Sequence, residues 1–401
     1  MLEELFYLHK KTVENVPLEF KRYLSEDIDW KGQALCISGP RGVGKTTLLL
    51  QHYHELYGDV EKCLYLSADN VEVAAHGLLS TAQEYFKYGG EALIIDEIHK
   101  YPSWQIEIKN IIDTFKGKKV LFSGSSSLEL QEGKGDLSRR VVYYHLKGLS
   151  FREYLELKAK IKISVYSLPE VLDKHVKIAQ EVSEGITVLK YFQEYLASGY
   201  YPFFMEGEKT YLSKVLNIIE KVLYEDVAVI GGVRGANIRV IKKILWLIAT
   251  SSPFFVNIEK MGRELKISKE YLYQYLEYLE SAGLMISLRS GGKGYKPIRK
   301  PEKIFIENPN LLSAIHHSLM SESEKGVVRE TFFANQMRGI TSLALPDAGD
   351  FLVDGKYVFE IGGKDKNFEQ IKSLKNAWIA ADRIEIGHGN KIPLYLFGLL
   401  Y

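Results

Sequence analysis

The chain has 401 residues, 46% of them hydrophobic, and its 52 basic and 51 acidic residues leave a formal net charge of +1. This length allows two or three domains with sizeable cores, and the balanced charge excludes a global field that would draw the protein to DNA or to a membrane. No apolar run approaches the roughly 20 residues of a membrane span, and the acidic start, Met1 to Glu4, lacks the basic region of a targeting peptide. Cys36 and Cys63 fit buried thiols of a reducing compartment. We therefore expect a cytoplasmic protein with no membrane partner.

A glycine-rich segment follows the first strand-like run of the chain, residues 34–38, and precedes a helix-like run at 48–51. The segment reads Gly39-Pro40-Arg41-Gly42-Val43-Gly44-Lys45-Thr46-Thr47, a complete Gly-x4-Gly-Lys-Thr phosphate loop. Its glycines let backbone N–H groups wrap a phosphate at a helix N-terminus. We therefore predict that residues 39–47 bind ATP or ADP. Lys45 is expected to reach the β- and γ-phosphates, and Thr46 is expected to be a Mg²⁺ ligand.

Two acids follow the apolar run of residues 92–95, which is typical of a buried parallel strand. The carboxyl end of such a strand faces the ligand crevice of an α/β sheet. We therefore expect Asp96 to bind Mg²⁺ and Glu97 to polarise the attacking water as a general base. Residues 96–99 also match the Asp-Glu-x-His box of one helicase class, but that class needs a second motor half that this sequence does not show. His99 is accordingly expected to make a local interaction near the site.

A third strand, residues 120–126, turns abruptly from apolar to small and polar. A hydroxyl at its end could sense the γ-phosphate or position the water, and Ser123 and Ser125 alternate onto one face. We favour Ser125 because it extends further into the crevice, although a serine-rich turn would look the same. Arg139 and Arg140 follow a glycine-containing stretch, and either could neutralise charge that develops on the γ-phosphate.

Several sequence blocks, spread over nearly the whole chain, are informative as a set. They are Gly39–Thr47, Asp96–Trp104, Gly124–Leu128, Leu149–Tyr154, Ser198–Pro202 and Phe359–Lys364. In combination they resemble the predicted AAA+ ATPases of prokaryotes. The resemblance implies an N-terminal ATPase, a winged-helix middle and a C-terminal domain of the restriction-endonuclease type. It also implies that Arg140 corresponds to the family's arginine that precedes the strand before the Leu-Ser-Phe-x-Glu block. AAA+ proteins often place there an arginine finger that serves a neighbouring subunit. A homo-oligomer or another protein is therefore one expected partner.

Strand-like and helix-like stretches alternate from residue 33 to residue 157, which is typical of a doubly wound parallel sheet. The strand candidates are residues 34–38, 62–66, 92–96, 119–124 and 141–146. Residues 164–227 turn helical, as expected of a lid over the nucleotide, and the glycines of 231–235 fit either a hinge or a helix cap with a tight turn. We therefore predict an α/β P-loop NTPase (AAA+) fold with a helical lid over residues 1–230, a winged helix over 231–310 and an α/β nuclease-like domain over 311–401.

The middle segment has the element order of a winged helix. Helical patterns at residues 239–249, 257–265 and 269–281 precede a possible hairpin at 284–305. The wing, Arg289–Lys303, holds six basic residues against the single acid Glu302, a balance of +5 that is typical of phosphate contact. The basic residues are Arg289, Lys293, Lys296, Arg299, Lys300 and Lys303. Because phosphates would repel the three glutamates of the third helix, DNA contact is expected through the wing; a protein-packing module with a solvated basic loop is the alternative.

The C-terminal segment carries the acids of a possible second metal site. Asp350 and Glu360 lie on strand-like runs that flank Asp354-Gly355, a strong hairpin signal. A two-residue turn there would place Asp350 opposite Phe359, and one extra turn residue would place it opposite Glu360. Glu330 could complete an acidic cluster.

The expected chemistry of this tail is incomplete. The restriction-endonuclease motif places a lysine two residues after the glutamate, and that position is Gly362 here, so Lys364 would have to reach back. We therefore expect a degenerate nuclease, kept for packing or binding. The main hypothesis is a Mg²⁺-dependent ATPase that drives a conformational switch or a remodelling step on DNA or a DNA-associated partner. The alternatives are an ATP-gated metal-dependent nuclease and a nucleotide-dependent protein-interaction scaffold without DNA.

Overall fold

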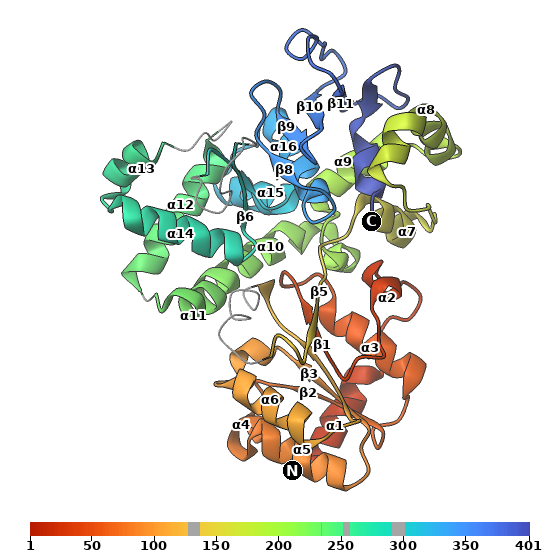
Figure 1. The fold of residues 1–401 in the computed structure, drawn as a ribbon, viewed down its shortest axis with the longest axis vertical. Coiled ribbons are helices and arrows are strands. Elements are labelled where there is room, and N and C mark those ends of the chain that lie inside the picture. Colours follow the sequence, from red (N-terminus) through yellow and green to blue (C-terminus); the bar gives the residue numbers. More distant parts are fainter. Residues whose placement is uncertain (127–136, 234, 252–256, 291–300) are drawn as a thin grey trace. The chain divides into compact units, whose positions relative to one another are not determined.

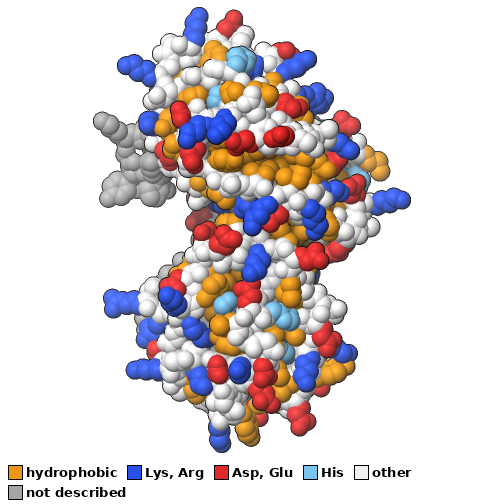
Figure 2. All heavy atoms as spheres, turned by 90° about the vertical axis from the view of Figure 1, so that its right-hand side faces the viewer, with side chains coloured by type: hydrophobic (Ala, Val, Ile, Leu, Met, Phe, Trp, Pro, Cys, Tyr) orange, Lys and Arg blue, Asp and Glu red, His pale blue; other side chains and the backbone are white. Residues whose placement is uncertain are grey.

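A computed structural model describes the chain from residue 1 to residue 401 except for residues 127–136, 234, 252–256 and 291–300 (Figure 1). The chain forms two compact units, Met1–Gly148 and Leu149–Tyr401. Lys and Arg side chains are interspersed with Asp and Glu on the face that Figure 2 shows, as the small net charge predicts. None of the described helices is long and apolar enough to cross a membrane.

The first unit is built on a sheet of five parallel strands. The strands are β1 (Ala34–Ser38), β2 (Cys63–Ser67), β3 (Ala92–Asp96), β4 (Lys119–Ser123) and β5 (Val142–His145). They lie within one or two residues of the predicted positions, which confirms the α/β prediction for this unit. The order is β2-β3-β4-β1-β5, so β4 lies between the strand that precedes the phosphate loop and the strand that ends in Asp96. Residues at the carboxyl end of β4 are therefore flanked by both parts of the predicted site.

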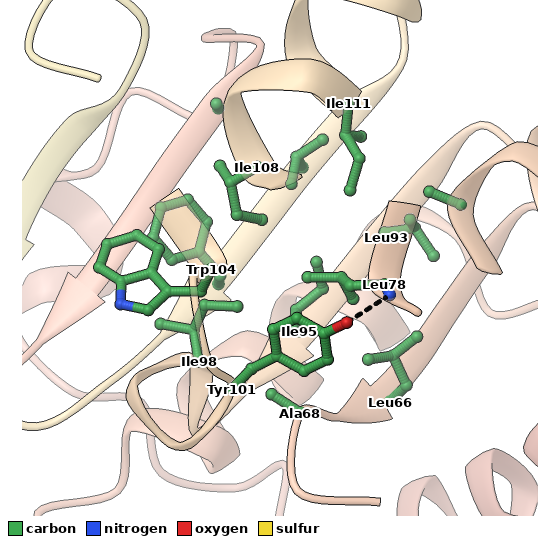
Figure 3. Packing of buried hydrophobic residues seen from close by; sticks show 14 of the residues in the cluster. Leu66, Ala68, Leu78, Leu93, Ile95, Ile98, Tyr101, Trp104, Ile108 and Ile111 are labelled. Carbon is green, nitrogen blue, oxygen red and sulfur yellow. Dashed lines mark hydrogen bonds between the residues drawn. The ribbon is translucent and has the colours of Figure 1, made fainter. Parts of the chain in front are cut away.

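Helices cover this sheet. They are α1 (Leu2–Val13), α2 (Leu24–Asp27), α3 (Lys45–Leu56), α4 (Val71–His76), α5 (Leu78–Lys87) and α6 (Trp104–Thr114), with the 3-10 turn η1 (Ile98–Lys100) between β3 and α6. Trp104, Ile108 and Ile111 repeat at helical spacing on α6 and are buried against the sheet (Figure 3). The Tyr101 hydroxyl accepts a 3.1 Å hydrogen bond from the Leu78 backbone N–H. This packing fixes the segment that follows Glu97.

The second unit begins with helices. They are α7 (Phe151–Ala159), α8 (Leu168–Ser183), α9 (Val188–Ser198), α10 (Tyr211–Lys221) and α11 (Ala228–Gly231), joined by the short turns η3 (Pro202–Glu206), η4 (Glu208–Thr210) and η5 (Val222–Val227). Ser150 and Ser167 each cap a helix, because their side chains accept a hydrogen bond from the backbone N–H of the residue three positions later. These residues are Glu153 and Glu170, and their carboxylates accept a hydrogen bond from the backbone N–H of the capping serine. These capping boxes explain why α7 and α8 begin where they do.

The next segment contains α12 (Ala236–Thr250), α13 (Ile258–Leu265) and α14 (Lys269–Ser281), followed by the antiparallel pair β6 (Met285–Leu288) and β7 (Lys303–Ile306). These elements lie where the sequence predicts three helices and a hairpin; the winged-helix assignment itself stays a prediction. Wing residues 291–300, which include Lys293, Lys296, Arg299 and Lys300, lie outside the described residues. Lys303 does not belong to a solvated wing, because it is only 3% exposed.

Helices α15 (Pro309–Ser318) and α16 (Lys325–Met337) precede a second five-stranded sheet in the order β12-β11-β10-β9-β8, and the turn η7 (Leu394–Leu399) follows it. The strands are β8 (Leu343–Ala344), β9 (Phe351–Val353), β10 (Tyr357–Gly362), β11 (Ala377–Ala381) and β12 (Lys391–Pro393). Val353 pairs with Tyr357 and Phe351 with Phe359, so the β9–β10 turn has one residue more than Asp354-Gly355. This register places Asp350 opposite Glu360.

Buried polar contacts join the parts of the second unit. Glu307, which is 8% exposed, accepts hydrogen bonds from the Tyr200 hydroxyl at 3.0 Å and from Asn335 Nδ2 at 2.8 Å. The Tyr200 backbone N–H donates to Asn310 at 2.8 Å. Removing one partner would leave a buried polar group unsatisfied, at a cost of about 1–3 kcal/mol. The predicted lid, middle and tail segments thus share one compact unit, and the boundaries predicted at residues 230 and 310 stay predictions.

Candidate nucleotide-binding site

The phosphate loop connects β1 to α3. Gly42 and Gly44 have φ angles of +80° and +97°, a region that favours glycine. At Gly39 a Cβ atom would stand 2.2 Å from the carbonyl oxygen of Leu146, so the close approach of these two segments requires glycine. The Arg22 guanidinium donates to the Val43 carbonyl inside the loop and, at 2.8 Å, to the Lys147 carbonyl. The loop is therefore held in its curved conformation by the rest of the unit.

Lys45 is the first residue of α3 and is 5% exposed. Its ammonium donates to the carbonyl oxygens of Gly39 at 3.0 Å and Pro40 at 2.8 Å. Both acceptors belong to the phosphate loop, so the ammonium group of Lys45 is held against the backbone of the loop. A phosphate received by the loop would meet this cation together with the N-terminus of α3.

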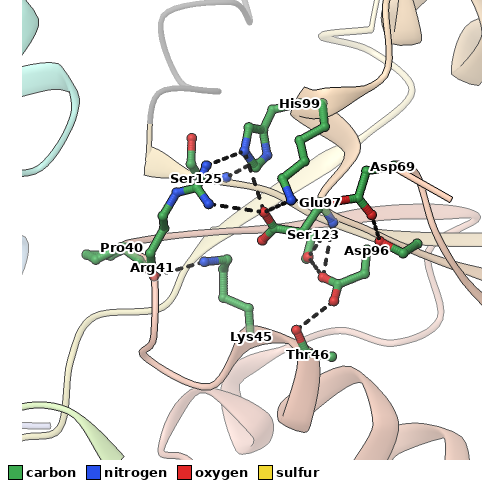
Figure 4. A network of polar contacts seen from close by, with 12 residues as sticks. Pro40, Arg41, Lys45, Thr46, Asp69, Asp96, Glu97, His99, Ser123 and Ser125 are labelled. Carbon is green, nitrogen blue, oxygen red and sulfur yellow. Dashed lines mark hydrogen bonds and ion pairs between the residues drawn. The ribbon is translucent and has the colours of Figure 1, made fainter. Parts of the chain in front are cut away.

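Asp96, at the end of β3, is the best anchored acid of the site (Figure 4). Its Oδ2 accepts hydrogen bonds from Thr46 Oγ1 at 2.7 Å and from the Tyr65 hydroxyl at 3.1 Å, and its Oδ1 accepts from Ser123 Oγ. Burial and the Asp96 carboxylate raise the pKa of the Tyr65 hydroxyl, which therefore stays a donor. Three hydroxyl donors thus fix the orientation of one carboxylate.

The donor set fits Mg²⁺. Thr46 and Asp96 offer two oxygen atoms 2.7 Å apart, close enough for one ion to contact both. Mg²⁺ in nucleotide sites is held by one or two protein oxygens plus phosphate oxygens and water. Among the described residues no group of three or more His, Cys, Asp and Glu side chains is gathered for a metal ion. An ion shared with a bound phosphate fits this sparse set, whereas an all-protein metal site does not.

Glu97 follows Asp96 with a φ of +53°, which is unusual for a residue with a side chain. Its Oε2 lies 3.6 Å from Arg41 Nη1, 3.6 Å from Lys100 Nζ and 3.7 Å from His99 Nε2. Lys100 is itself held by Asp69 at 2.6 Å. The predicted base is thus surrounded by cationic or proton-donating groups, one of which belongs to the phosphate loop.

The Ser123 hydroxyl donates to Asp96 Oδ1. The sequence favoured Ser125 as the residue that senses the γ-phosphate or positions the water, and that role stays a prediction. β4 ends at Ser123, so Ser125 lies two residues beyond the strand. Ser125 directs its backbone N–H to His99 Nδ1 at 3.4 Å. Ser123 could have been found as the last residue of the apolar run on the strand next to β3; we find no sequence signal for Tyr65.

Arg140 lies away from the phosphate loop of its own chain. It pairs with Asp113 at the end of α6, with nitrogen–oxygen distances of 2.7 and 3.0 Å. Arg140 precedes β5, whereas the phosphate loop follows β1, and these two strands are parallel. Arg140 therefore lies near the amino end of this strand pair, and the phosphate loop lies at its carboxyl end. Arg140 is therefore not placed to act on a phosphate bound by its own loop.

A polar pocket of about 540 Å³ lies in the second unit beside Asp350 and Glu360. Lys303 pairs with Glu330 at 2.6 Å and with Asp350 at 3.7 Å, and Lys366 pairs with Glu360. Burial, followed by the neighbouring Asp350, raises the pKa of Glu330, and burial also raises that of Glu360. Lysines already neutralise the acids of the predicted second metal site.

The cation beside Glu360 does not come from Lys364, the residue that the sequence suggested. A Cβ at Gly362 would stand 2.6 Å from Cβ and Cγ of Lys366. The stem of Lys366 thus occupies the space that a side chain at position 362 would fill, and its ammonium reaches Glu360. A lysine is therefore present beside this glutamate, and it comes from a position four residues after Gly362.

Comparison with known families bears on both units. Residues 31–155 match the AAA domain family. That segment contains the phosphate loop, Asp96 and all five strands of the first sheet. Residues 189–323, in the second unit, match a domain of unknown function (DUF8612).

Individual relatives are distant. An uncharacterized protein of Methanocaldococcus jannaschii, MJ1637, is 27% identical over 384 residues, which cover 88% of this chain and 80% of that protein. The DNA repair protein RadA of Campylobacter jejuni is 28% identical over 167 residues, 36% of this chain and 37% of RadA. Among solved structures, AMPPCP-bound DnaA from Aquifex aeolicus is 16% identical with a TM-score of 0.28, covering 69% of this chain and 88% of that one. A TM-score this low carries no argument for this chain.

Proposed function

We propose that the AAA domain binds ATP with Mg²⁺ and hydrolyses it, and that the second unit uses the nucleotide state to act on DNA or on a DNA-associated partner. One observation carries the proposal: Thr46 on α3 and Asp96 on β3 bring their oxygens within 2.7 Å of each other beside the phosphate loop. The match of residues 31–155 to the AAA domain family supports it.

Each residue of the site has its own role in the proposed reaction. Loop N–H groups and Lys45 receive the phosphates, and Thr46 and Asp96 would hold Mg²⁺, whose charge stabilises the transferring phosphoryl group when the ion is bound. Glu97 accepts the proton of the attacking water. Ser123 and Tyr65 keep Asp96 oriented, so that the carboxylate does not have to reorganise during the reaction.

Binding tests the first half of this function. Replacing Lys45 by alanine removes a charge-assisted phosphate contact, so we expect nucleotide affinity to fall about 100-fold or more. The exposed Lys87, at the end of α5, is the matched control, and Lys87→Ala should bind as the wild type does. Isothermal titration with Mg²⁺–ADP measures both variants. Unchanged affinity in Lys45→Ala would refute the assignment of the site.

Contact with DNA is proposed through the wing, residues 289–303. Two of its six basic residues already have acidic neighbours: Arg289 lies 3.6 Å from Glu280, and Lys303 is buried against Glu330. The remaining four, Lys293, Lys296, Arg299 and Lys300, lie outside the described residues and carry this proposal from the sequence alone. Without DNA contact, the same ATPase would serve as a protein-interaction scaffold. ATP turnover measured with and without DNA separates the two.

A second candidate, an ATP-gated metal-dependent nuclease, is favoured by one observation: Lys366 supplies the ammonium beside Glu360. The ion pairs of Lys303 and Lys366 oppose it, because an ion would have to displace both lysines from the three acids. We therefore expect duplex and single-stranded DNA to survive incubation with Mg²⁺ or Mn²⁺, with and without ATP. Cleavage that disappears in Asp350→Ala or Glu360→Ala would establish the nuclease.

A further inference from the structure

We infer that Arg41 is a positioning residue that couples the presence of a γ-phosphate to the release of Glu97. This inference rests on the proposed ATPase function. In this inference Arg41 holds the carboxylate of Glu97, the proposed base, until a nucleoside triphosphate is bound.

Geometry places Arg41 between the phosphate loop and the base (Figure 4). Its side chain is 9% exposed, and its Nη1 lies 3.6 Å from Glu97 Oε2. The neighbouring Nη2 lies 3.2 Å from His99 Nε2. Lys45 holds the carbonyl of Pro40, the residue directly before Arg41, so the loop's phosphate-binding lysine and the guanidinium belong to one short stretch of backbone.

His99 makes this arrangement sensitive to the position of Arg41. Two donors face its ring, the Arg41 guanidinium at Nε2 and the Ser125 backbone N–H at Nδ1, 3.4 Å away. A neutral imidazole accepts a hydrogen bond at only one nitrogen. When Arg41 moves away, Nδ1 can accept from Ser125 while Nε2–H donates to Glu97, which already lies 3.7 Å from it. His99 then replaces Arg41 as the group that orients the base, with Lys100 unchanged on the other side.

The γ-phosphate provides a reason for Arg41 to move. A terminal phosphate carries more negative charge than a carboxylate and accepts the two-pronged hydrogen bonding of a guanidinium. ADP lacks this group, so it leaves the Arg41–Glu97 pair in place. The loop is thereby expected to distinguish ATP from ADP through Arg41, whereas Lys45 binds both nucleotides.

The test measures the affinity of Mg²⁺–AMPPCP and Mg²⁺–ADP for the wild type, Arg41→Ala and Arg41→Lys, with Lys87→Ala as the control. We expect Arg41→Ala to bind AMPPCP about tenfold more weakly, since it loses a charged hydrogen bond, and to bind ADP within about twofold. Arg41→Lys should restore part of the difference. Glu97→Gln should tighten AMPPCP binding in the wild-type background more than in the Arg41→Ala background, because it frees Arg41 from its partner.

The outcomes separate this inference from the proposed function. Equal losses for both nucleotides in Arg41→Ala, or no loss for either, would overturn the role of Arg41 while leaving the ATPase intact. A wild-type protein that binds neither nucleotide would instead overturn the proposed function. A Glu97→Gln effect of the same size in both backgrounds would show that Arg41 and Glu97 are not coupled.

Discussion

The hydroxyl of Thr46 lies 2.7 Å from the carboxylate of Asp96, although the two residues are 50 positions apart in the sequence. Thr46 lies in the first turn of α3, which follows β1 and the phosphate loop. Asp96 ends β3, which is two places from β1 in the sheet. β4 fills the place between those strands, and its last residue, Ser123, bonds to the other oxygen of Asp96. The order of the strands therefore brings Thr46 and Asp96 together and places the Ser123 hydroxyl where it can donate to Asp96.

Ser123 and Ser125 provide a matched pair of variants. We expect Ser123→Ala to lower the rate of ATP hydrolysis about tenfold, because Asp96 loses a hydrogen bond worth roughly 1.5 kcal/mol. Ser125→Ala keeps the backbone N–H that contacts His99 and should stay within about twofold of the wild-type rate. Steady-state kinetics on the two variants measure the difference. A larger loss in Ser125→Ala would support the catalytic role that the sequence predicts for Ser125.

Arg140 can act only on the site of another copy of the chain if it acts at all. We expect Arg140→Ala to lower hydrolysis by about 1,000-fold, as the loss of an arginine finger does. Mixing it with Lys45→Ala subunits should restore activity, because those subunits supply Arg140 to an intact loop. Asp113→Ala, which removes only the ion-pair partner of Arg140, should remain active. Failure of mixing, with a strictly monomeric particle in light scattering, would remove Arg140 from the reaction.

The sequence could predict the residues whose chemistry depends on local spacing. The phosphate loop and Asp96-Glu97 follow apolar strand runs, and parallel strands end at one edge of a sheet, so their meeting is predictable. Ser123, Tyr65 and the contacts of Arg41 depend on strand order and side-chain direction, which a single sequence does not contain. The same holds for Lys366, since only the folded turn brings its stem across Gly362.

Helix and strand positions were predictable for a similar reason, because periodicity and caps are local. The grouping of helices was not. Contacts such as that between Tyr200 and Asn310 join segments 110 residues apart, and the sequence of neither segment alone indicates which residue the other will contact. Lys303 shows the same limit: its place in a basic stretch suggested solvent exposure, whereas the fold buries it against Glu330.

Salt dependence tests the wing. Replacing Lys296, Arg299 and Lys300 together by alanine should flatten the slope of log affinity against log salt by up to about three, if each contacts one phosphate. The affinity should depend only weakly on DNA sequence. Lys303→Ala is the control, since this buried lysine should affect stability and leave the slope unchanged. Identical slopes in the wild type and the triple variant would exclude phosphate contact by these residues.

Acid should destabilise the first unit through His52. Burial lowers the pKa of this side chain to about 4, and its ring stacks on Trp30 at 3.7 Å between centroids. The unfolded chain, with a histidine pKa near 6.5, binds the proton first, so the contribution of His52 to stability is present above about pH 6.5 and is lost as the pH falls toward 4. Denaturant titrations between pH 7.5 and 5 measure this loss. His52→Gln should reduce the pH slope by up to about one bound proton, and an unchanged slope would contradict the assignment.

The most direct measurement of ATP hydrolysis at this site is single-turnover cleavage of bound ATP by Glu97→Gln beside the wild type. The glutamine keeps the shape of the side chain but cannot accept a proton, so the variant should bind ATP at least as tightly and cleave it about 100-fold more slowly or worse. Lys45→Ala, which should not bind, controls for a contaminating ATPase. Cleavage by Glu97→Gln at the wild-type rate would contradict the role of Glu97 and with it the proposed chemistry of this site.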